Sequence, residues 1–254
     1  MAPPLLEVKD LHVGYGEVQV LRGVSIDLQD KERIGLFGPN GHGKTTLLKT
    51  ISGLLRPWKG EIRFAGKVIS GKSPRELVEV GIIQVPQGNT LFPRMSVMEN
   101  LLIGAYADRA WKKRRQGLER VFELFPRLAE RKSQLCRTLS GGERQMLAMG
   151  VGLMGHGQVL MLDEPTLGLA PKIKDELREA IQQIAATGVP MILVEQDLEF
   201  LLALTDRLLL VQEGRIVLEK THASSEIEHA RILEMYFGGL DQAEPDLALG
   251  GKIT

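Results

Sequence analysis

One glycine-rich segment constrains the fold of this chain more than any other feature, because it lies between a strand-like and a helix-like apolar pattern. Residues 33–37 form a short apolar run typical of a strand. After the glycines, apolar residues recur at helical spacing until Gly53 and Pro57, which predict the end of a helix. One face of this helix is expected to carry Leu47, Leu48, Ile51, Leu54 and Leu55.

The segment has the pattern of a phosphate-binding loop. Residues 38–45 match Gly-x-x-x-x-Gly-Lys-Thr in full. The glycines let successive backbone N–H groups face an anion, and the positive end of the following helix points at the same place. Lys44 is then placed to reach the β- and γ-phosphates of a nucleotide, and Thr45 to ligate magnesium. The alternative is a glycine-rich turn that only begins a helix.

Two acidic residues follow a second apolar run. The residues at 159–162 are typical of a strand covered on both faces, and Asp163 and Glu164 stand where that strand would emerge. A phosphate loop needs a further metal-binding carboxylate at the end of a neighbouring strand. Asp163 is therefore predicted to hold Mg²⁺, directly or through water, and Glu164 to orient or deprotonate an attacking water.

A third motif precedes another helical pattern. Its residues are Leu139, Ser140, Gly141, Gly142, Glu143, Arg144 and Gln145. Ser140 followed three residues later by Glu143 is a capping box, and this explanation needs no ligand. A cap does not need two consecutive glycines, however. The glycine pair exposes backbone N–H groups at the start of a helix and predicts a second anion site.

Charge and composition exclude several classes of protein. The chain of 254 residues has 32 basic and 32 acidic side chains, so no overall field attracts a nucleic acid. The single cysteine, Cys136, cannot form an internal disulfide, which favours a reducing compartment. The first residues lack the pattern of a secretory signal, and no apolar run is long enough to span a bilayer. A cytoplasmic location is expected.

The other patterns predict an α/β chain with a helical insert. The first thirty residues alternate apolar and polar side chains, as antiparallel strands with one exposed face do. Residues 96–155 are almost entirely helical in pattern, and residues 239–254 are expected to be a poorly ordered tail. Further sheet segments are predicted at 61–68, 81–86, 158–162 and 189–194, and a further helix at 172–187.

Together, the three motifs resemble those of the nucleotide-binding subunits of ATP-binding cassette (ABC) transporters. The resemblance covers residues 5–238 and implies one ATPase domain. Its α/β core would be a P-loop NTPase fold with a mostly parallel sheet, formed by residues 5–88 and 156–238 and including an N-terminal antiparallel β subdomain. Residues 89–155 would form an inserted α-helical subdomain that carries the third motif, the family's signature. In this family two subunits pair head to tail, so each ATP lies between the phosphate loop of one and the signature of the other.

The resemblance also implies roles for single residues. Tyr15 corresponds to the aromatic residue that stacks on adenine, although its place also suits a half-exposed strand aromatic. Gln87 corresponds to the glutamine that contacts magnesium and the attacking water, and residues 167–170 to the segment that crosses the dimer interface. The residues expected to bind ATP are Tyr15, Gly38, Pro39, Asn40, Gly41, His42, Gly43, Lys44, Thr45 and Thr46 in one subunit, and Leu139, Ser140, Gly141, Gly142, Glu143 and Gln145 in the other.

One position departs from the superfamily pattern. Most members have a histidine after the strand at 191–194 that hydrogen-bonds the γ-phosphate, but this chain has Gln196. A glutamine amide donates such a bond yet cannot take up a proton at neutral pH, so the role of general base falls on Glu164. The chain resembles most the ATPase subunits of importers for branched-chain amino acids, and those for urea and other amides. The segments that carry this resemblance are 85–88, 91–93, 167–171 and 194–196.

Partners follow from the same resemblance. An identical or paralogous ATPase subunit would complete the sites, and permease subunits would dock on the helical subdomain at the inner face of the cell membrane. A substrate-binding protein would take part indirectly, and no nucleic acid. The basic cluster at 109–115 is either close to the anionic membrane surface or a solvated helix face. Leu91, Phe92, Pro93, Met95 and Met98 form either a partner groove or a local core.

Two other functions compete with transport. A cytosolic ABC ATPase acting on nucleic acid or ribosomes would share all three motifs, but such proteins usually carry coiled-coil or zinc insertions or two cassettes, which this sequence lacks. A P-loop kinase or GTPase would need acceptor-binding or guanine-reading motifs and no signature. An importer ATPase that hydrolyses MgATP is therefore the expected function.

Overall fold

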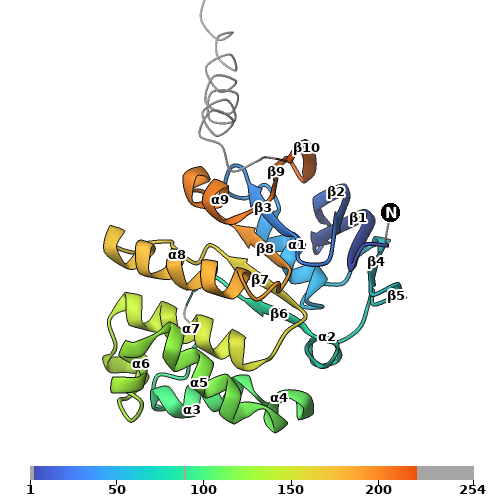
Figure 1. The fold of residues 1–254 in the computed structure, drawn as a ribbon. Helices are drawn as coiled ribbons and strands as arrows, with labels where there is room; N and C mark the ends of the chain where they lie inside the picture. The colour runs from blue at the N-terminus through green and yellow to red at the C-terminus, as the bar shows by residue number, and fades with distance from the viewer. Residues whose placement is uncertain (1–2, 89, 222–254) are drawn as a thin grey trace, which may run out of the picture.

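The structure, a computed structural model, describes residues 3–88 and 90–221. The strands of these residues form two sheets, one with the order β2-β1-β4-β5 and one with the order β10-β9-β3-β8-β7-β6 (Figure 1). The strands are β1 (Leu6–Tyr15), β2 (Val18–Leu28), β3 (Arg33–Phe37), β4 (Lys59–Phe64), β5 (Lys67–Val68), β6 (Ile82–Val85), β7 (Val159–Asp163), β8 (Met191–Val194), β9 (Arg207–Gln212) and β10 (Arg215–Thr221).

The larger sheet is parallel except at one edge. Strand β3 pairs in parallel with β8 and β9, and β7 pairs in parallel with β6 and β8, whereas β10 is antiparallel to β9. The carboxyl ends of β3, β6, β7 and β8 therefore lie along the same edge, where ligands bind in open α/β sheets. The smaller sheet is antiparallel throughout, as the alternation of the first thirty residues predicts.

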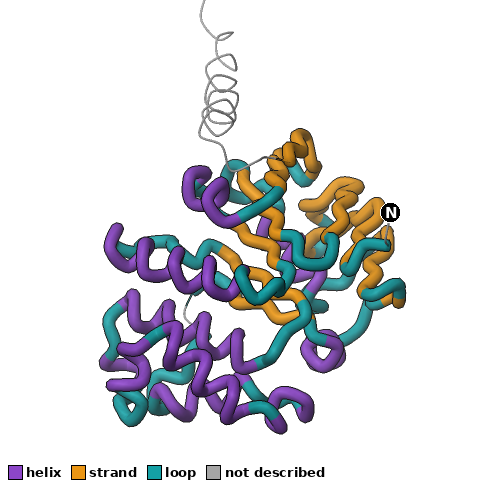
Figure 2. Tube along the Cα trace, viewed as in Figure 1, coloured by secondary structure: helices purple, strands orange, loops and turns teal. Residues whose placement is uncertain are grey.

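The helices fall into two groups. They are α1 (Lys44–Ile51), α2 (Pro74–Val80), α3 (Val97–Gly104), α4 (Asp108–Lys112), α5 (Arg114–Leu124), α6 (Pro126–Glu130), α7 (Gly141–Met154), α8 (Pro171–Ala185) and α9 (Leu198–Leu204), with a short 3₁₀ turn at Cys136–Thr138. Helices α3 to α7 follow one another between β6 and β7. Figure 2 shows them gathered at one end of the molecule, away from the smaller sheet. The fold is thus the predicted α/β core with an antiparallel β sheet and a helical insert.

The parallel sheet is buried on both faces. In β7, Leu160 and Leu162 belong to a hydrophobic cluster with residues of α7, α8 and α9. Val159 and Met161, which point the opposite way, belong to a second cluster with residues of α1 and the smaller sheet. This two-sided burial explains the continuous apolar run at 159–162.

The helix after the glycine-rich loop ends earlier than its apolar pattern predicts. Ile51 is its last residue, and Gly53 then turns the chain with φ 76°. The N–H of Leu54 donates to the carbonyl oxygen of Lys49 at 2.8 Å, which closes the helix end. Leu54 is 56% exposed and does not lie on the buried face, so that part of the prediction is wrong.

Four elements were not predicted from the sequence: α2, α9, β9 and β10. Helix α2 begins with a complete capping box between Ser73 and Glu76, a local signal that identifies its start. Residues 61–68, predicted as a sheet segment, fold as the hairpin of β4 and β5.

The basic cluster at 109–115 is not a uniform surface. The guanidinium group of Arg109 donates to the carbonyl oxygens of Val78 at 3.0 Å, Gly155 at 3.1 Å and His156 at 3.0 Å. Arg109 therefore joins α4 to α2 and to the turn between α7 and β7, and it belongs to neither of the two predicted surfaces.

The apolar loop that precedes α3 was predicted to be either a partner groove or a local core, and the structure shows one residue of each kind. Leu91 is buried, whereas Phe92 is 50% exposed. Asn100, itself 1% exposed, accepts from the N–H of Phe92 at 2.8 Å and donates to its carbonyl oxygen at 3.1 Å. The loop is thus held in place with Leu91 in the core and Phe92 on the surface.

Within residues 3–88 and 90–221, no helix is both long enough and apolar enough to cross a membrane. The predicted tail at 239–254, and the final part of the predicted domain at 222–238, lie outside the described residues.

Candidate active site

The glycine-rich loop connects β3 to α1 in a conformation that requires its glycines. Gly38 has φ 134° and Gly43 has φ 107°, values that L-residues with a side chain rarely adopt. A Cβ atom on Gly38 would lie 2.2 Å from the carbonyl oxygen of Val211, and one on Gly43 would lie 2.6 Å from Leu21. Helix α1 has no side-chain cap and no acidic residue in its first turn. Its N–H groups are therefore left for a ligand of negative charge.

Lys44 lies inside this loop. It is 4% exposed, and its ammonium group donates to the carbonyl oxygens of Gly38 at 2.7 Å and Pro39 at 3.0 Å. Burial lowers the pKa of Lys44, and the carboxylates of Glu164 and Asp163 oppose that shift. The ammonium group of Lys44 is thus held at the loop, where it interacts electrostatically with the carboxylates of Glu164 and Asp163.

Asp163 lies opposite the start of α1. The hydroxyl of Thr45 donates to its Oδ1 at 3.0 Å, and the residue is 2% exposed. Burial raises the pKa of Asp163 above its ordinary value, against the hydrogen bond from Thr45. Its other oxygen, Oδ2, is buried and has no hydrogen-bond partner among the described residues. A buried carboxylate oxygen in this state calls for a cation or a water molecule as a partner.

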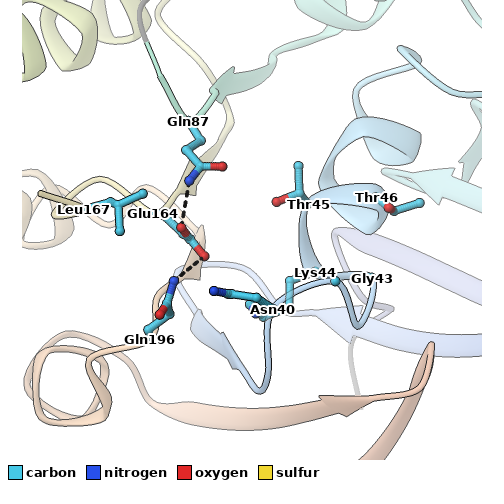
Figure 3. Close-up of a pocket in the computed structure, with 10 residues that line it drawn as sticks. Asn40, Gly43, Lys44, Thr45, Thr46, Gln87, Glu164, Leu167 and Gln196 are labelled. Atoms are coloured by element: carbon cyan, nitrogen blue, oxygen red, sulfur yellow. Dashed lines mark hydrogen bonds between the residues drawn. The ribbon is translucent and has the colours of Figure 1, made fainter.

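Two amide side chains hold the carboxylate of Glu164. Gln87, which follows β6, donates to Oε2 at 2.8 Å, and Gln196, which follows β8, donates to Oε1 at 3.1 Å (Figure 3). Glu164 itself has φ 47°, an uncommon value for a residue with a side chain, and its N–H donates to the carbonyl oxygen of Val194 at 2.9 Å. Gln196 thus contacts Glu164, a contact that the sequence does not predict.

All of these side chains except Asp163 border one cavity of about 330 Å³. In Figure 3 the glycine-rich loop and the start of α1, which carries Lys44 and Thr45, lie on one side, and Glu164 with its two amides lies on the other. The amide oxygen of Gln87 points away from Glu164 (Figure 3). The lining residues are Asn40, Gly41, Gly43, Lys44, Thr45, Thr46, Gln87, Glu164, Leu167 and Gln196. A phosphate chain on the loop would therefore face the carboxylate of Glu164 across the cavity.

The signature residues do not line this cavity. Ser140 caps α7 with a complete capping box, in which its N–H donates to Glu143 Oε2 at 2.9 Å. Arg131 pairs with the other oxygen of Glu143 at 2.9 Å. A Cβ atom on Gly142 would lie 2.7 Å from Ile173 of α8, whereas one on Gly141 would meet nothing within 4 Å. The second glycine is therefore explained by packing, and the first is not.

Tyr15 and the remaining loop residues have other surroundings. Tyr15, at the end of β1, is 46% exposed and does not line the cavity. His42 accepts a hydrogen bond at Nδ1 from the N–H of Glu213 at 3.1 Å, and its carbonyl oxygen accepts from the N–H of Gly214 at 3.1 Å. The turn between β9 and β10 thus supports the phosphate loop from behind, a role for His42 that sequence reasoning missed.

The chain is similar in sequence to ATP-binding subunits of known transporters. Residues 21–167 match the family described as ABC transporter. The high-affinity branched-chain amino acid transport ATP-binding protein BraG of Pseudomonas aeruginosa is 40% identical, over 89% of this chain and 96% of its own length. The chain belongs to the ABC transporter family. The probable branched-chain amino acid transport ATP-binding protein LivF of Archaeoglobus fulgidus is 35% identical over 93% of this cassette and 100% of its own length.

Solved structures place this ABC cassette among its relatives. A nucleotide-free ATP-binding cassette has a TM-score of 0.79 at 26% identity and covers 92% of this chain and 99% of its own. A cassette in its ADP conformation has a TM-score of 0.77 at 27% identity, over 93% and 100%. The protein is thus an ATP-binding and ATP-hydrolysing ABC transporter subunit. The transport names of its relatives do not favour the alternative of an ATPase that acts on nucleic acid or ribosomes.

Proposed function

We propose that this cassette hydrolyses MgATP to drive the uptake of branched-chain amino acids, or of a related small polar solute, through separate permease subunits. The chemistry is carried by one observation: the carboxylate of Glu164 faces the phosphate loop across the cavity and is held there by Gln87 and Gln196. The cargo is supported by the two relatives named for branched-chain amino acid transport, which align over nearly their whole lengths.

In this proposal the phosphates of ATP lie on the N–H groups of residues 38–46, with Lys44 turned from its loop carbonyls to the β- and γ-phosphates. A water molecule between the γ-phosphate and Glu164 attacks phosphorus in line. A bond forms from the water oxygen to the γ-phosphorus, the bond from the γ-phosphorus to the bridging oxygen breaks, and ADP leaves. Glu164 takes the proton of the water. Gln87 and Gln196 orient that carboxylate without competing for the proton.

Magnesium fits the oxygen atoms that the chain offers. Thr45 and Asp163 would hold it, because their oxygens are adjacent and Oδ2 of Asp163 is buried without a partner in the described part of the chain. The amide oxygen of Gln87 would approach it as well. Bound there, the ion would neutralise the charge that develops on the phosphate oxygens.

The proposed assembly is a head-to-tail pair of cassettes, with an identical or a paralogous partner. Gly141 supports this arrangement, because its surroundings are open in the single chain. The signature of one subunit would then meet the ATP of the other, and Tyr15 would stack on adenine at the exposed end of β1. Permease subunits would dock on the helical insert at the cytoplasmic face of the membrane, where Phe92 offers an exposed apolar side chain.

We propose the corresponding division of the chain. Residues 5–88 and 156–238 form the ATPase core, and residues 89–155 form the helical subdomain, which contains all of α3 to α7. Residues 222–238 of this division lie outside the described part of the chain.

The test is a Glu164→Gln variant, assayed both in solution and in cells. The amide cannot accept the proton of the attacking water, so ATP turnover should fall about 100- to 10,000-fold while ATP still binds. Cells that lack the native chain should regain uptake of radiolabelled leucine, isoleucine or valine with the wild type and not with Glu164→Gln. Turnover at the wild-type rate in the variant removes Glu164 from the role of base. Normal uptake of all three amino acids without this chain removes the proposed cargo.

A further inference from the structure

A second carboxylate lies behind Glu164. Glu195 follows β8 directly, and it is 3% exposed. Its Oε1 accepts from the N–H of Thr166 at 2.8 Å, and its Oε2 accepts from the N–H of Gln196 at 3.3 Å. Burial raises the pKa of Glu195, while hydrogen bonds from the N–H and the hydroxyl of Thr166 and from the N–H of Gln196 oppose the shift. A carboxylate so deeply buried is costly unless such bonds hold it in place.

Glu195 joins the two segments that carry the proposed catalytic groups. Thr166, which is 2% exposed, lies two residues after Glu164, and Gln196 is the next residue after Glu195. The segments are also linked by the bond from the N–H of Glu164 to the carbonyl oxygen of Val194 at 2.9 Å. Residues 164–166 are thus attached at both ends to residues 194–195.

The backbone of Glu164 needs such an attachment. Its φ of 47° costs free energy for a residue with a side chain and persists only where the surroundings hold it. The bond to Val194 fixes the residue on its N-terminal side. The bonds from Thr166 to Glu195 fix the chain on its C-terminal side, so the direction of the Glu164 side chain depends on both.

We infer that Glu195 is a positioning residue for ATP hydrolysis, which holds Glu164 and Gln196 in fixed relation to each other and to the phosphate loop. The third link supports this arrangement: the N–H of Glu195 donates to the carbonyl oxygen of Leu36 at 3.2 Å, in the strand that leads into the loop. Glu195 does not line the cavity and touches no phosphate in this scheme. The inference rests on the proposed role of Glu164 as the base.

The first experiment compares Glu195→Gln with a matched control. A glutamine keeps the volume but replaces one carboxylate oxygen by an NH2 group, so the N–H of either Thr166 or Gln196 would face a donor in place of its acceptor. We expect kcat to fall about 10- to 100-fold, because small misplacements of a catalytic group cost that much. The KM for ATP should stay within about twofold, because the phosphate loop is untouched.

The control is Glu32→Gln, at the opposite end of β3. Glu32 also accepts from a backbone N–H, that of Gln29 at 2.7 Å, and it pairs with Arg207 at 2.9 Å. Its substitution should lower the Tm and leave kcat per folded molecule unchanged. Equal kcat for Glu195→Gln and the wild type, or a parallel loss in the control, overturns the inference. Should Glu195→Gln not fold, Thr166→Val removes only the hydroxyl bond, and a loss in kcat at constant KM is again the expected result; an unchanged kcat overturns the inference.

The second experiment separates positioning from general structure. In a Glu164→Gln background, measured under single-turnover conditions, adding Glu195→Gln should cost less than about twofold, because the group that it positions is already gone. If the two losses multiply, Glu195 does not act through Glu164, and the inference fails. If Glu164→Gln alone hydrolyses ATP at the wild-type rate, the proposed function of Glu164 fails instead.

Discussion

The starts of helices α1 and α7 look alike in sequence and differ in structure. Glycines precede α1 and form the first two residues of α7, and both helix starts are predicted to bind an anion. Helix α1 has a glycine cap with φ 107°, no side-chain cap and no acidic residue in its first turn. Helix α7 has a serine cap, a complete capping box and the acidic residue Glu143 in its first turn. The N–H groups of α1 are open, whereas α7 is capped by its own residues.

This difference matches the different roles proposed for the two motifs in binding ATP. In the proposed function the phosphate loop would bind ATP with groups of a single chain, because Lys44 and the start of α1 line one cavity. The start of α7 carries a negative charge of its own, which pairs with Arg131, and its surface is open at Ser140 and Gly141. In the proposed head-to-tail pair, the signature would bind its anion only together with the ATP of a second cassette.

Of the substitutions that test this comparison, removal of the Lys44 ammonium group should have the largest effect, which is a loss of affinity for ATP. Lys44→Ala deletes the charged group nearest the phosphates, and the affinity of the single chain for ATP should fall about 10- to 100-fold, the value of a charge-assisted hydrogen bond. Titration calorimetry with a non-hydrolysable ATP analogue measures the change. Ser140→Ala is the control from the other motif and should leave that affinity unchanged. Similar losses in both variants would contradict the division between the motifs.

The two glycines of the signature give a sharper test within α7. Gly142→Ala places a methyl group 2.7 Å from Ile173, and overpacking of this kind costs about 1–3 kcal/mol, or several degrees in Tm. Gly141→Ala meets nothing within 4 Å and should leave the Tm unchanged. If the signature meets ATP across a pair of cassettes, Gly141→Ala should nevertheless lower ATP turnover. Thermal unfolding and turnover rates, measured on both variants, check the two expectations.

The opposite outcome is equally informative. A stable Gly141→Ala variant with wild-type turnover would show that the open surface at Gly141 receives no ligand. A Gly142→Ala variant as stable as the wild type would show that α7 and α8 separate more easily than their packing indicates.

The parts of the fold that sequence predicts well are those with strong local signals. The loop at 38–45 requires its glycines for positive φ and close packing, so its pattern defines its geometry. The apolar run at 159–162 has few alternatives to a strand buried on both faces. The end of α1 was placed too late, because Leu54 continues a helical pattern that Gly53 interrupts. The apolar pattern favours a longer helix there, but the positive φ of Gly53 ends the helix.

Contacts between segments that are distant along the chain could not be predicted from the sequence. Gln87 and Gln196 are 77 and 32 residues away from Glu164 along the chain, and nothing local indicates that both amides meet its carboxylate. The buried state of Glu195 depends on β8 lying between β3 and β7, which is a property of strand order. His42 is similar, because its partner Glu213 belongs to a turn that was not predicted.

The smallest expected effect concerns the charge at the start of α7. Burial tends to raise the pKa of Glu143, but the hydrogen bonds from Ser140 and the charge of Arg131 outweigh it, so the pKa lies below its ordinary value of 4.5. A lowered pKa means that the ionised side chain stabilises the folded state at neutral pH. Glu143→Gln should therefore cost about 1 kcal/mol at pH 7. That cost should shrink as the pH falls below about 4.5 and through the pKa of the folded protein, where the wild type loses the same charge.

Urea denaturation at several pH values measures this cost, and α3 supplies the control. Glu99 completes the same capping box with Ser96, but its side chain is exposed. Glu99→Gln should follow the same pH dependence with a smaller amplitude, because no burial strengthens its hydrogen bonds. A cost for Glu143→Gln that does not change with pH would mean that the carboxylate charge contributes nothing at α7.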